Sequence, residues 1–228
     1  MRSIWRTLDP GLARDIGLVC LADGVVGLSY GAISVGGGLP LWVPVLLSVV
    51  VFAGASQFLF VGIVAAGGSP IAAMIAGVLV NTRHVPFGLA VSDVIGSGWR
   101  RWLGSHLMTD ENVAFALGQE ELQQKRKAYW AAGLGIFVCW NLGVVIGGLA
   151  GSVITDTDVF GLDAAFPAVL LALVLPALRD RATRRAALIG AVVALATTPI
   201  LPSGLPVLCA LAGLLFYRTD KPALEVGR

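Results

Sequence analysis

The sequence predicts an all-α fold: a polytopic membrane helix bundle of about seven spans. Hydrophobic residues make up 57% of the 228 residues, and the mean hydropathy is +0.84. Charged residues make up only 13%, against about 25% in an ordinary globular protein. The charges gather in a few segments separated by long apolar runs, which is typical of chains that lie in lipid. We expect a single transmembrane domain over residues 1–228, and the net charge of +2 gives no reason to expect nucleic acid as a partner.

Seven apolar segments are expected to form the spans. The first four have about the 20 residues that a helix needs to cross a bilayer. The last three are shorter and rich in proline, so we expect them to be broken, tilted or buried within the bundle. The segments cover residues 16–38, 41–66, 70–91, 129–153, 164–178, 186–200 and 205–217.

The basic residues predict the orientation of the chain. Twelve lysines and arginines lie in the 92–128 loop, the 179–185 turn and the 218–228 tail, which the positive-inside rule places in the cytoplasm. The loop that holds Asp156, Asp158 and Asp163 contains no basic residue and is expected outside. This count favours a cytoplasmic C-terminus and an external N-terminus. Three arginines in residues 1–15 oppose the external N-terminus, and a miscounted first or second span would explain the conflict.

Two further features are given structural interpretations. Segment 92–128 is expected to be a solvated loop, with an amphipathic piece around Trp99 and Trp102 at the membrane interface. The cysteines Cys20, Cys139 and Cys209 lie in apolar stretches without CxxC or Cys/His spacing, so we expect buried inert thiols and no cofactor or metal.

An internal repeat is suggested by the alignment of the first and fourth spans at an offset of 119 residues. The third and sixth spans also align, and Pro86 and Pro199 then fall at nearly matching places. Each copy holds three spans, so the second would be inverted, giving a 3+3 arrangement plus one helix. Paired breaks in inverted repeats are typical of secondary transporters, which bind their substrate at the repeat interface. The alternative is that simple apolar sequence aligns with itself by chance.

Polar side chains within the first two spans are candidates for function. An ionised side chain at mid-helix costs roughly 2.5–3.5 kcal/mol on insertion scales, so each needs a reason. Asp23 in the first span could carry a proton or pair structurally with a buried arginine. Ser56 and Gln57 in the second span could bind a ligand or hydrogen-bond across packed helices.

The third span holds the densest polar cluster, Asn81, Arg83 and His84, followed by Pro86. Arg83 could bind a carboxylate in bidentate fashion or extend to the membrane interface. His84 could relay protons or be a hydrogen-bonded structural group. Pro86 removes a backbone hydrogen bond and exposes carbonyls nearby. On a continuous helix Asn81 and His84 would share a face, with Arg83 elsewhere.

These residues define a predicted site between the broken third and sixth helices, walled by the first two. The substrate-binding candidates are Arg83, Asn81, Gln57, Ser56, Phe52, Pro86 and Thr198. The proton-coupling candidates are His84 and Asp23. In the fourth span, Gly143, Gly147 and Gly151 repeat every four residues and are expected to form a helix-packing seam.

Four stretches, in this order, resemble the AzlC family, the large subunits of branched-chain amino acid exporters. They are FAGASQF at 52–58, VNTRH at 80–84, TDE at 109–111 and GLDAAFP at 161–167. The resemblance runs from about residue 15 to residue 217. The sequence departs from many relatives at Val85, Pro86 and Phe87, which affects the expected geometry of the third span.

The resemblance implies a multi-pass protein of the bacterial plasma membrane that exports leucine, isoleucine, valine and sometimes methionine. It also implies a small hydrophobic partner of the AzlD type and export driven by the proton motive force, as in an antiporter. A facilitative permease or channel for another small neutral solute is the alternative, and a structural subunit without its own path is a third reading. The sequence has no GxxxxGK[ST] or HExxH motif, so we expect neither ATP hydrolysis nor an enzyme.

Overall fold

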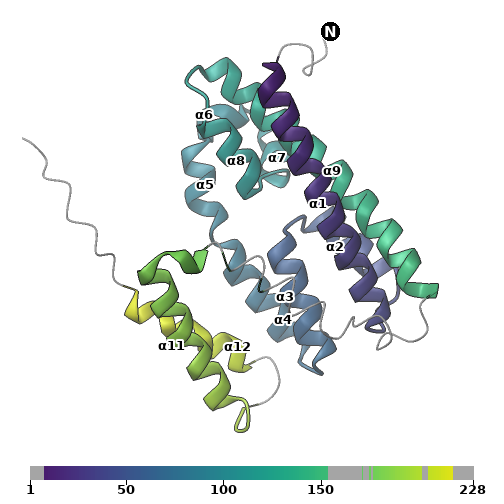
Figure 1. The fold of residues 1–228 in the computed structure, drawn as a ribbon, viewed down its shortest axis with the longest axis vertical. Helices are drawn as coiled ribbons and strands as arrows, with labels where there is room; N and C mark the ends of the chain where they lie inside the picture. Colours follow the sequence, from purple (N-terminus) through teal and green to yellow (C-terminus); the bar gives the residue numbers. More distant parts are fainter. Residues whose placement is uncertain (1–7, 154–170, 172–174, 176, 202–204, 218–228) are drawn as a thin grey trace, which may run out of the picture.

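The computed structural model describes residues 8–153, 171, 175, 177–201 and 205–217, and every regular element in these ranges is helical. Two long helices, α1 (Pro10–Gly36) and α9 (Leu122–Val153), lie side by side along the molecule (Figure 1). Asp9 caps α1 by accepting hydrogen bonds from the backbone N–H groups of Gly11 and Leu12, and Pro10 occupies the first helical position. Among the described residues, α1 and α9 are the helices long and apolar enough to cross a membrane.

Small residues let α1 and α9 approach closely. Gly143, Gly147 and Gly151 of α9 rest on the backbone of α1 at Gly24, Leu28 and Ala32, so the packing seam predicted from the glycine spacing is confirmed. A Cβ atom added at Gly151 would lie 2.6 Å from the carbonyl oxygen of Ala32. Larger side chains would therefore force the two helices apart.

The three pairs also fix the relative direction of the two helices. Residue numbers rise together along the seam, so α1 and α9 run parallel and begin at the same end of the molecule. An inverted repeat would require corresponding helices to be antiparallel. The seam therefore gives no support to the expected inversion, although it joins residues at the same 119-residue offset as the sequence alignment. It also places the start of α1 and the start of α9 at one end of the bundle, against the expectation of opposite sides.

The second expected span is a helical hairpin. Helix α2 (Trp42–Val50) runs antiparallel to α9, with the Ser48 hydroxyl donating to the Asn141 side-chain oxygen at 2.6 Å. The chain turns at Phe52, whose φ of 44° is unusual for a bulky residue. Helix α3 (Gly54–Ala65) then runs back and packs on the next helix, so neither half of 41–66 has the length of a span.

The third expected span is broken four residues before its proline. Helix α4 (Pro70–Asn81) ends where Thr82 and Arg83 turn, and α5 (His84–Ala90) continues toward the start of α9. The ring of Pro86 cannot donate to the carbonyl of Thr82 and would collide with it in a continuous helix. This conflict explains why the break precedes the proline, which then lies in the first turn of α5.

Segment 92–128 is not the solvated loop that its charges suggested. It forms α6 (Ser92–Ile95), α7 (Trp99–His106), α8 (Asp110–Leu117) and the first turns of α9. The turn between α7 and α8 is buried at Leu107, which accepts a hydrogen bond from the Asn112 side-chain amide at 2.7 Å. Trp99 and Trp102 are exposed, as expected of an amphipathic piece, and their place at a membrane interface stays a prediction.

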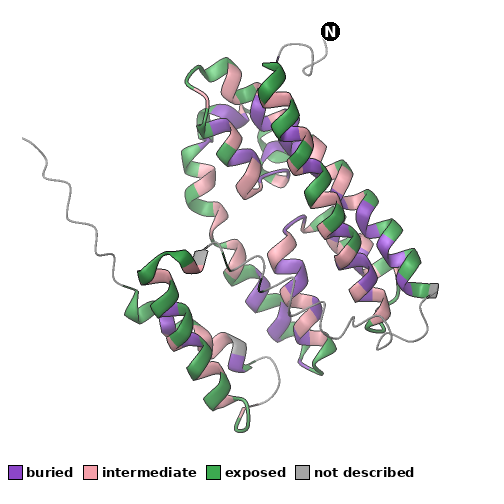
Figure 2. Cartoon of the chain, in the orientation of Figure 1, coloured by how far each residue is buried: buried purple, intermediate pink, exposed green. Residues whose placement is uncertain are grey.

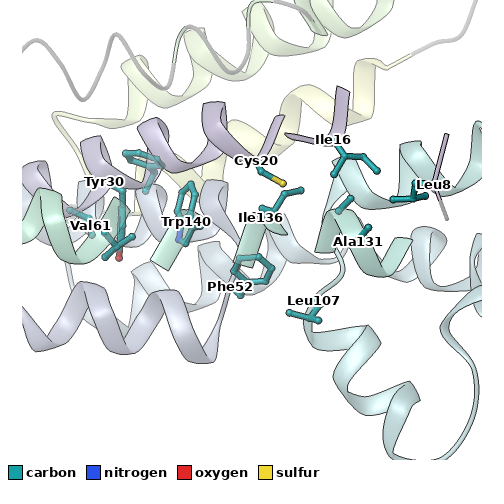
Figure 3. Close-up of a cluster of buried hydrophobic side chains, with 13 residues drawn as sticks. Leu8, Ile16, Cys20, Tyr30, Phe52, Val61, Leu107, Ala131, Ile136 and Trp140 are labelled. Atoms are coloured by element: carbon teal, nitrogen blue, oxygen red, sulfur yellow. The ribbon is translucent and has the colours of Figure 1, made fainter. Parts of the chain in front are cut away.

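The α7–α8 hairpin enters from the end of the bundle where α9 begins, and the α2–α3 hairpin enters from the opposite end (Figure 1). Their turns meet halfway along α9. The rings of Phe52 and His106 lie 6.2 Å apart, and both pack on Phe137. Figure 2 shows buried residues where these elements face α1 and α9, and Figure 3 shows the apolar cluster from Tyr30 through Trp140 and Ile136 to Leu107.

The C-terminal part contains η2 (Ala177–Arg179), α11 (Arg181–Thr197), α12 (Leu205–Cys209) and η3 (Ala210–Phe216). Gly190 and Gly213 bring α11 and η3 into close contact, and α12 touches α4. Most of the expected fifth span, the acidic loop and the tail lie outside the described residues. The chain is therefore all-helical in its described part, and the count of seven spans is not confirmed.

Candidate functional site

A cavity of about 370 Å³ lies where three interruptions of helix meet: the α2–α3 turn, the α4–α5 break and the α7–α8 turn. Its volume is within the range of sites for small ligands. Asp23 of α1 reaches it thirteen residues from either end of that helix, about 20 Å at 1.5 Å per residue. The lining residues are Asp23, Val26, Phe52, Ala53, Gly54, Ala55, Phe58, Arg83, His84, Thr109, Asp110, Glu111, Ile136 and Trp140.

An ion pair spans the cavity between the α4–α5 break and α8. The Arg83 guanidinium donates to Asp110 Oδ2 at 2.8 Å, with both side chains only partly exposed. Arg83 Nε and Asp110 Oδ1 are enclosed and have no hydrogen-bond partner within the described structure. Arg83 is thus engaged by a protein carboxylate, which favours a role at the site over extension to a membrane interface.

His84 follows Arg83 into the cavity. Its Nδ1 lies 3.1 Å from the backbone oxygen of Asn81, and because a carbonyl only accepts, Nδ1 carries the proton of this hydrogen bond. Arg83 and His84 both line the cavity while Asn81 does not, so the expected grouping of Asn81 with His84 is wrong. The interruption between α4 and α5, at Thr82 and Arg83, lies between these two residues.

Two carboxylates from different elements face the cavity beside this ion pair. Asp23 Oδ2 is enclosed without a hydrogen-bond partner within the described structure, and the negative charge of Glu111 on α8 acts on Asp23. The arginine at this depth pairs with Asp110, so the structure does not support a structural Asp23–arginine pair. No cluster of three metal-binding side chains was found among the described residues.

The N-terminus of α3 also opens into the cavity. Ala53 at the cap position offers no capping side chain, although its own N–H donates to Gln57 Oε1 at 3.1 Å. The N–H groups of Gly54 and Ala55 lie in the first helical turn, where no intrahelical acceptor is available. Both residues line the cavity, so the partial positive charge of the helix end faces it.

The other predicted site residues lie elsewhere. Ser56, Gln57 and Asn81 line a separate cavity of about 420 Å³ between α2, α3 and α4. Pro86 is exposed on α5 and lines neither cavity. Thr198 follows α11 and donates to the Ala194 oxygen at 2.8 Å, and in the described part of the chain α11 packs mainly on η2, α12 and η3. The structure thus brings Asp23, Phe52, Arg83 and His84 together.

Sequence reasoning missed the contributions of α8 and α9. Thr109 accepts from the Asn112 N–H at 3.3 Å and donates its own N–H to Asn112 Oδ1 at 2.9 Å, a capping box. Threonine followed by two acids and a polar third residue is a helix-start signal that could have placed Asp110 and Glu111 on a helix. The charges of segment 92–128 favour a solvated loop instead. Trp140 gave no signal because an aromatic residue in an apolar span is usually core.

The described helices and the cavity define an all-helical membrane protein with a partly open site, lined by polar and apolar side chains, between interrupted helices. The sequence profile of the AzlC protein family matches residues 19–154, and the chain belongs to this family.

Relatives in distant organisms carry the name "uncharacterized membrane protein". The Helicobacter pylori relative is 25% identical over 173 residues, which cover 75% of each chain. The Archaeoglobus fulgidus relative is 31% identical over 153 residues, which cover 66% of this chain and 67% of its own. The Haemophilus influenzae relative is 23% identical over 133 residues, 57% of this chain and 54% of its own. No solved structure matches the chain.

Proposed function

We propose that this protein is the large subunit of a two-component exporter of branched-chain amino acids. The observation that carries the proposal is the composition of the central cavity. Charged groups of both signs and an uncapped helix end share its walls with apolar side chains. A zwitterion with an aliphatic side chain has the matching chemistry: a carboxylate, an ammonium group and an apolar body.

The cavity offers a partner for each part of such a substrate. Asp23 and Glu111 provide negative charge for the ammonium group, and Arg83 or the α3 N-terminus provides positive charge for the carboxylate. Val26, Phe58 and Ile136 contribute apolar wall for the side chain. The volume of about 370 Å³ leaves room for an amino acid with some water.

Export against a gradient needs an energy source and a path that is never open to both sides. The proton motive force is the proposed source, with Asp23 or His84 as the group that takes up and releases the proton. The two half-length hairpins and the broken third span supply elements that can move against the longer helices. A small hydrophobic subunit of the AzlD type is the proposed partner.

Efflux from loaded cells tests this function. Cells that lack other exporters are fed leucine-containing dipeptides, which are hydrolysed inside, and leucine in the medium is then followed over time. Cells with this chain and its small partner should release leucine several-fold faster than cells without them, and a protonophore should abolish the difference. Equal release in both strains would refute the proposal, while protonophore-resistant release would indicate a facilitative permease.

A further inference from the structure

Hydrogen-bond donors without partners gather on one wall of the central cavity, where α3 begins against α9. The N–H groups of Gly54 and Ala55 belong to the uncapped first turn of α3. Trp140 of α9 lies directly against this turn, since a Cβ atom added at Gly54 would be 3.0 Å from its Cη2 atom. The six-membered ring of the indole therefore packs on the first turn of α3 at the cavity wall.

Trp140 is an independent sign of a ligand here. Its side chain is only 5% exposed, and its Nε1–H is enclosed with no hydrogen-bond partner within the described structure. The ring is held by stacking on Tyr30, at a centroid distance of 6.0 Å, and by an edge contact with Phe58 at 6.4 Å. Trp140 lines the cavity, and a buried donor without an acceptor is unfavourable, so the unpartnered indole N–H favours an acceptor bound beside this ring.

We propose that the substrate carboxylate is bound by the N-terminus of α3 together with the indole N–H of Trp140, and not by Arg83. This inference rests on the proposed function and specifies the orientation of the substrate within that site. Helix N-termini bind anions through free N–H groups and the helix dipole, and broken helices in transporters present such ends to substrate carboxylates.

The electrostatics of the opposite elements favour this orientation. The Arg83 guanidinium is already bound to Asp110 at 2.8 Å, so a carboxylate arriving there would meet a negative group. Glu111, next to Asp110 on α8, adds further repulsion. A carboxylate held at α3 instead leaves the ammonium group free to face Asp23 and Glu111. The substrate then lies across the cavity along the existing separation of charge.

The test compares two ligands that differ at the carboxylate. Leucine and leucinamide share the ammonium group and the side chain, but leucinamide is uncharged where leucine has its carboxylate. Dissociation constants are measured by titration calorimetry on the purified chain with its small partner, as wild type and as Trp140→Phe, which removes the N–H and keeps most of the ring. We expect leucine binding to weaken about tenfold or more, as for loss of a hydrogen bond to a charged group, with leucinamide changed less than about twofold.

Trp130→Phe is the matched control, because Trp130 lies on the same helix and does not line the cavity. It should leave both dissociation constants unchanged. Equal weakening of both ligands by Trp140→Phe, or no change for leucine, would overturn the inference. So would an Arg83→Gln variant that weakens leucine binding and spares leucinamide. If wild type binds neither ligand, the proposed function itself fails, which is a different result from either of these.

Discussion

Arg83 and Asp110 show how two opposite charges are accommodated at a partly open cavity in an apolar fold. Each would be costly alone in a low-dielectric setting, and each is stabilised by the other at 2.8 Å. Their remaining polar atoms, Arg83 Nε and Asp110 Oδ1, lack partners within the described structure. The pair is thus only partly satisfied, which fits the proposed transport function, in which these charges rearrange, better than a purely structural bridge.

Removing one charge of this pair should lower the stability of the protein more than exchanging the two charges. Asp110→Asn leaves Arg83 uncompensated and should lower the free energy of unfolding by about 1–3 kcal/mol, less than for a fully buried pair because both side chains are partly exposed. Thermal unfolding in detergent measures this. The double variant Arg83→Asp, Asp110→Arg should recover part of the loss. A double variant as unstable as the sum of its single changes would show that the pair contributes little.

Asp23→Asn should abolish the coupling of leucine transport to protons without abolishing transport itself. The amide keeps the size of the side chain but cannot carry a proton, so leucine counterflow in proteoliposomes should persist while stimulation by a pH gradient is lost. Asp15→Asn, an exposed position on the same helix, serves as the control and should keep the stimulation. Full stimulation in Asp23→Asn would assign proton coupling to another group, with His84 the next candidate.

At the scale of elements, the contact between α1 and α9 depends on glycine. Gly147→Ala would place a methyl group against the backbone oxygen of Leu28, and overpacking of this kind costs typically 1–3 kcal/mol. Gly17→Ala on α1 is the matched control, because a Cβ atom there would meet nothing within 4 Å. Gly147→Ala should lower the melting temperature and Gly17→Ala should leave it unchanged or slightly higher. Equal melting temperatures would mean that the helices adjust without loss.

Periodicity and composition predicted the two long helices and the glycine seam, because these features follow from local sequence. They could not predict the hairpins. Residues 41–66 read as one apolar span, and the turn at Phe52 carries neither glycine nor proline. In the same way, proline marked the interruption of the third span but not its position at Thr82 and Arg83, which decides the side chains that enter the cavity.

Charge at segment 92–128 misled the sequence analysis for a different reason. Arg100 and Arg101 lie in the first turn of α7, and the other basic residues of the segment lie in the first turns of α9, while the α7–α8 turn near Leu107 is buried. The sequence of such a helix, with charged residues at its start and buried residues at its end, has the same composition as a solvated loop. The candidate site was therefore predicted where polar groups interrupt apolar runs, at Asp23, Arg83 and His84, and missed where they follow a charged segment.

At the scale of the whole molecule, the parallel direction of α1 and α9 removes the conflict in the distribution of basic residues. Arg14 near the start of α1 and the basic residues of 92–128 come to the same end of the bundle. Under the positive-inside rule this end is cytoplasmic, and the N-terminus is therefore expected inside. The expectation of an external N-terminus depends on counting 41–66 as a full span, whereas this segment forms the α2–α3 hairpin.

Accessibility of added cysteines tests this orientation, on a background without Cys20, Cys139 and Cys209. Asp9→Cys and Lys125→Cys should react with a membrane-impermeant thiol reagent only in permeabilised cells. Ala66→Cys, an exposed position in the turn between α3 and α4 at the other end, should react in intact cells. Labelling of Asp9→Cys and Lys125→Cys with opposite patterns would contradict the parallel arrangement.

The central claim is that the cavity enclosed by the three interruptions of helix is where the substrate binds. A high-resolution structure of the protein with its partner, determined with and without saturating leucine, tests this most directly. The account predicts additional density for one amino acid in contact with Gly54, Trp140 and Asp23. Leucine density in the cavity formed by Ser56, Gln57 and Asn81, with the central cavity unchanged, would contradict it.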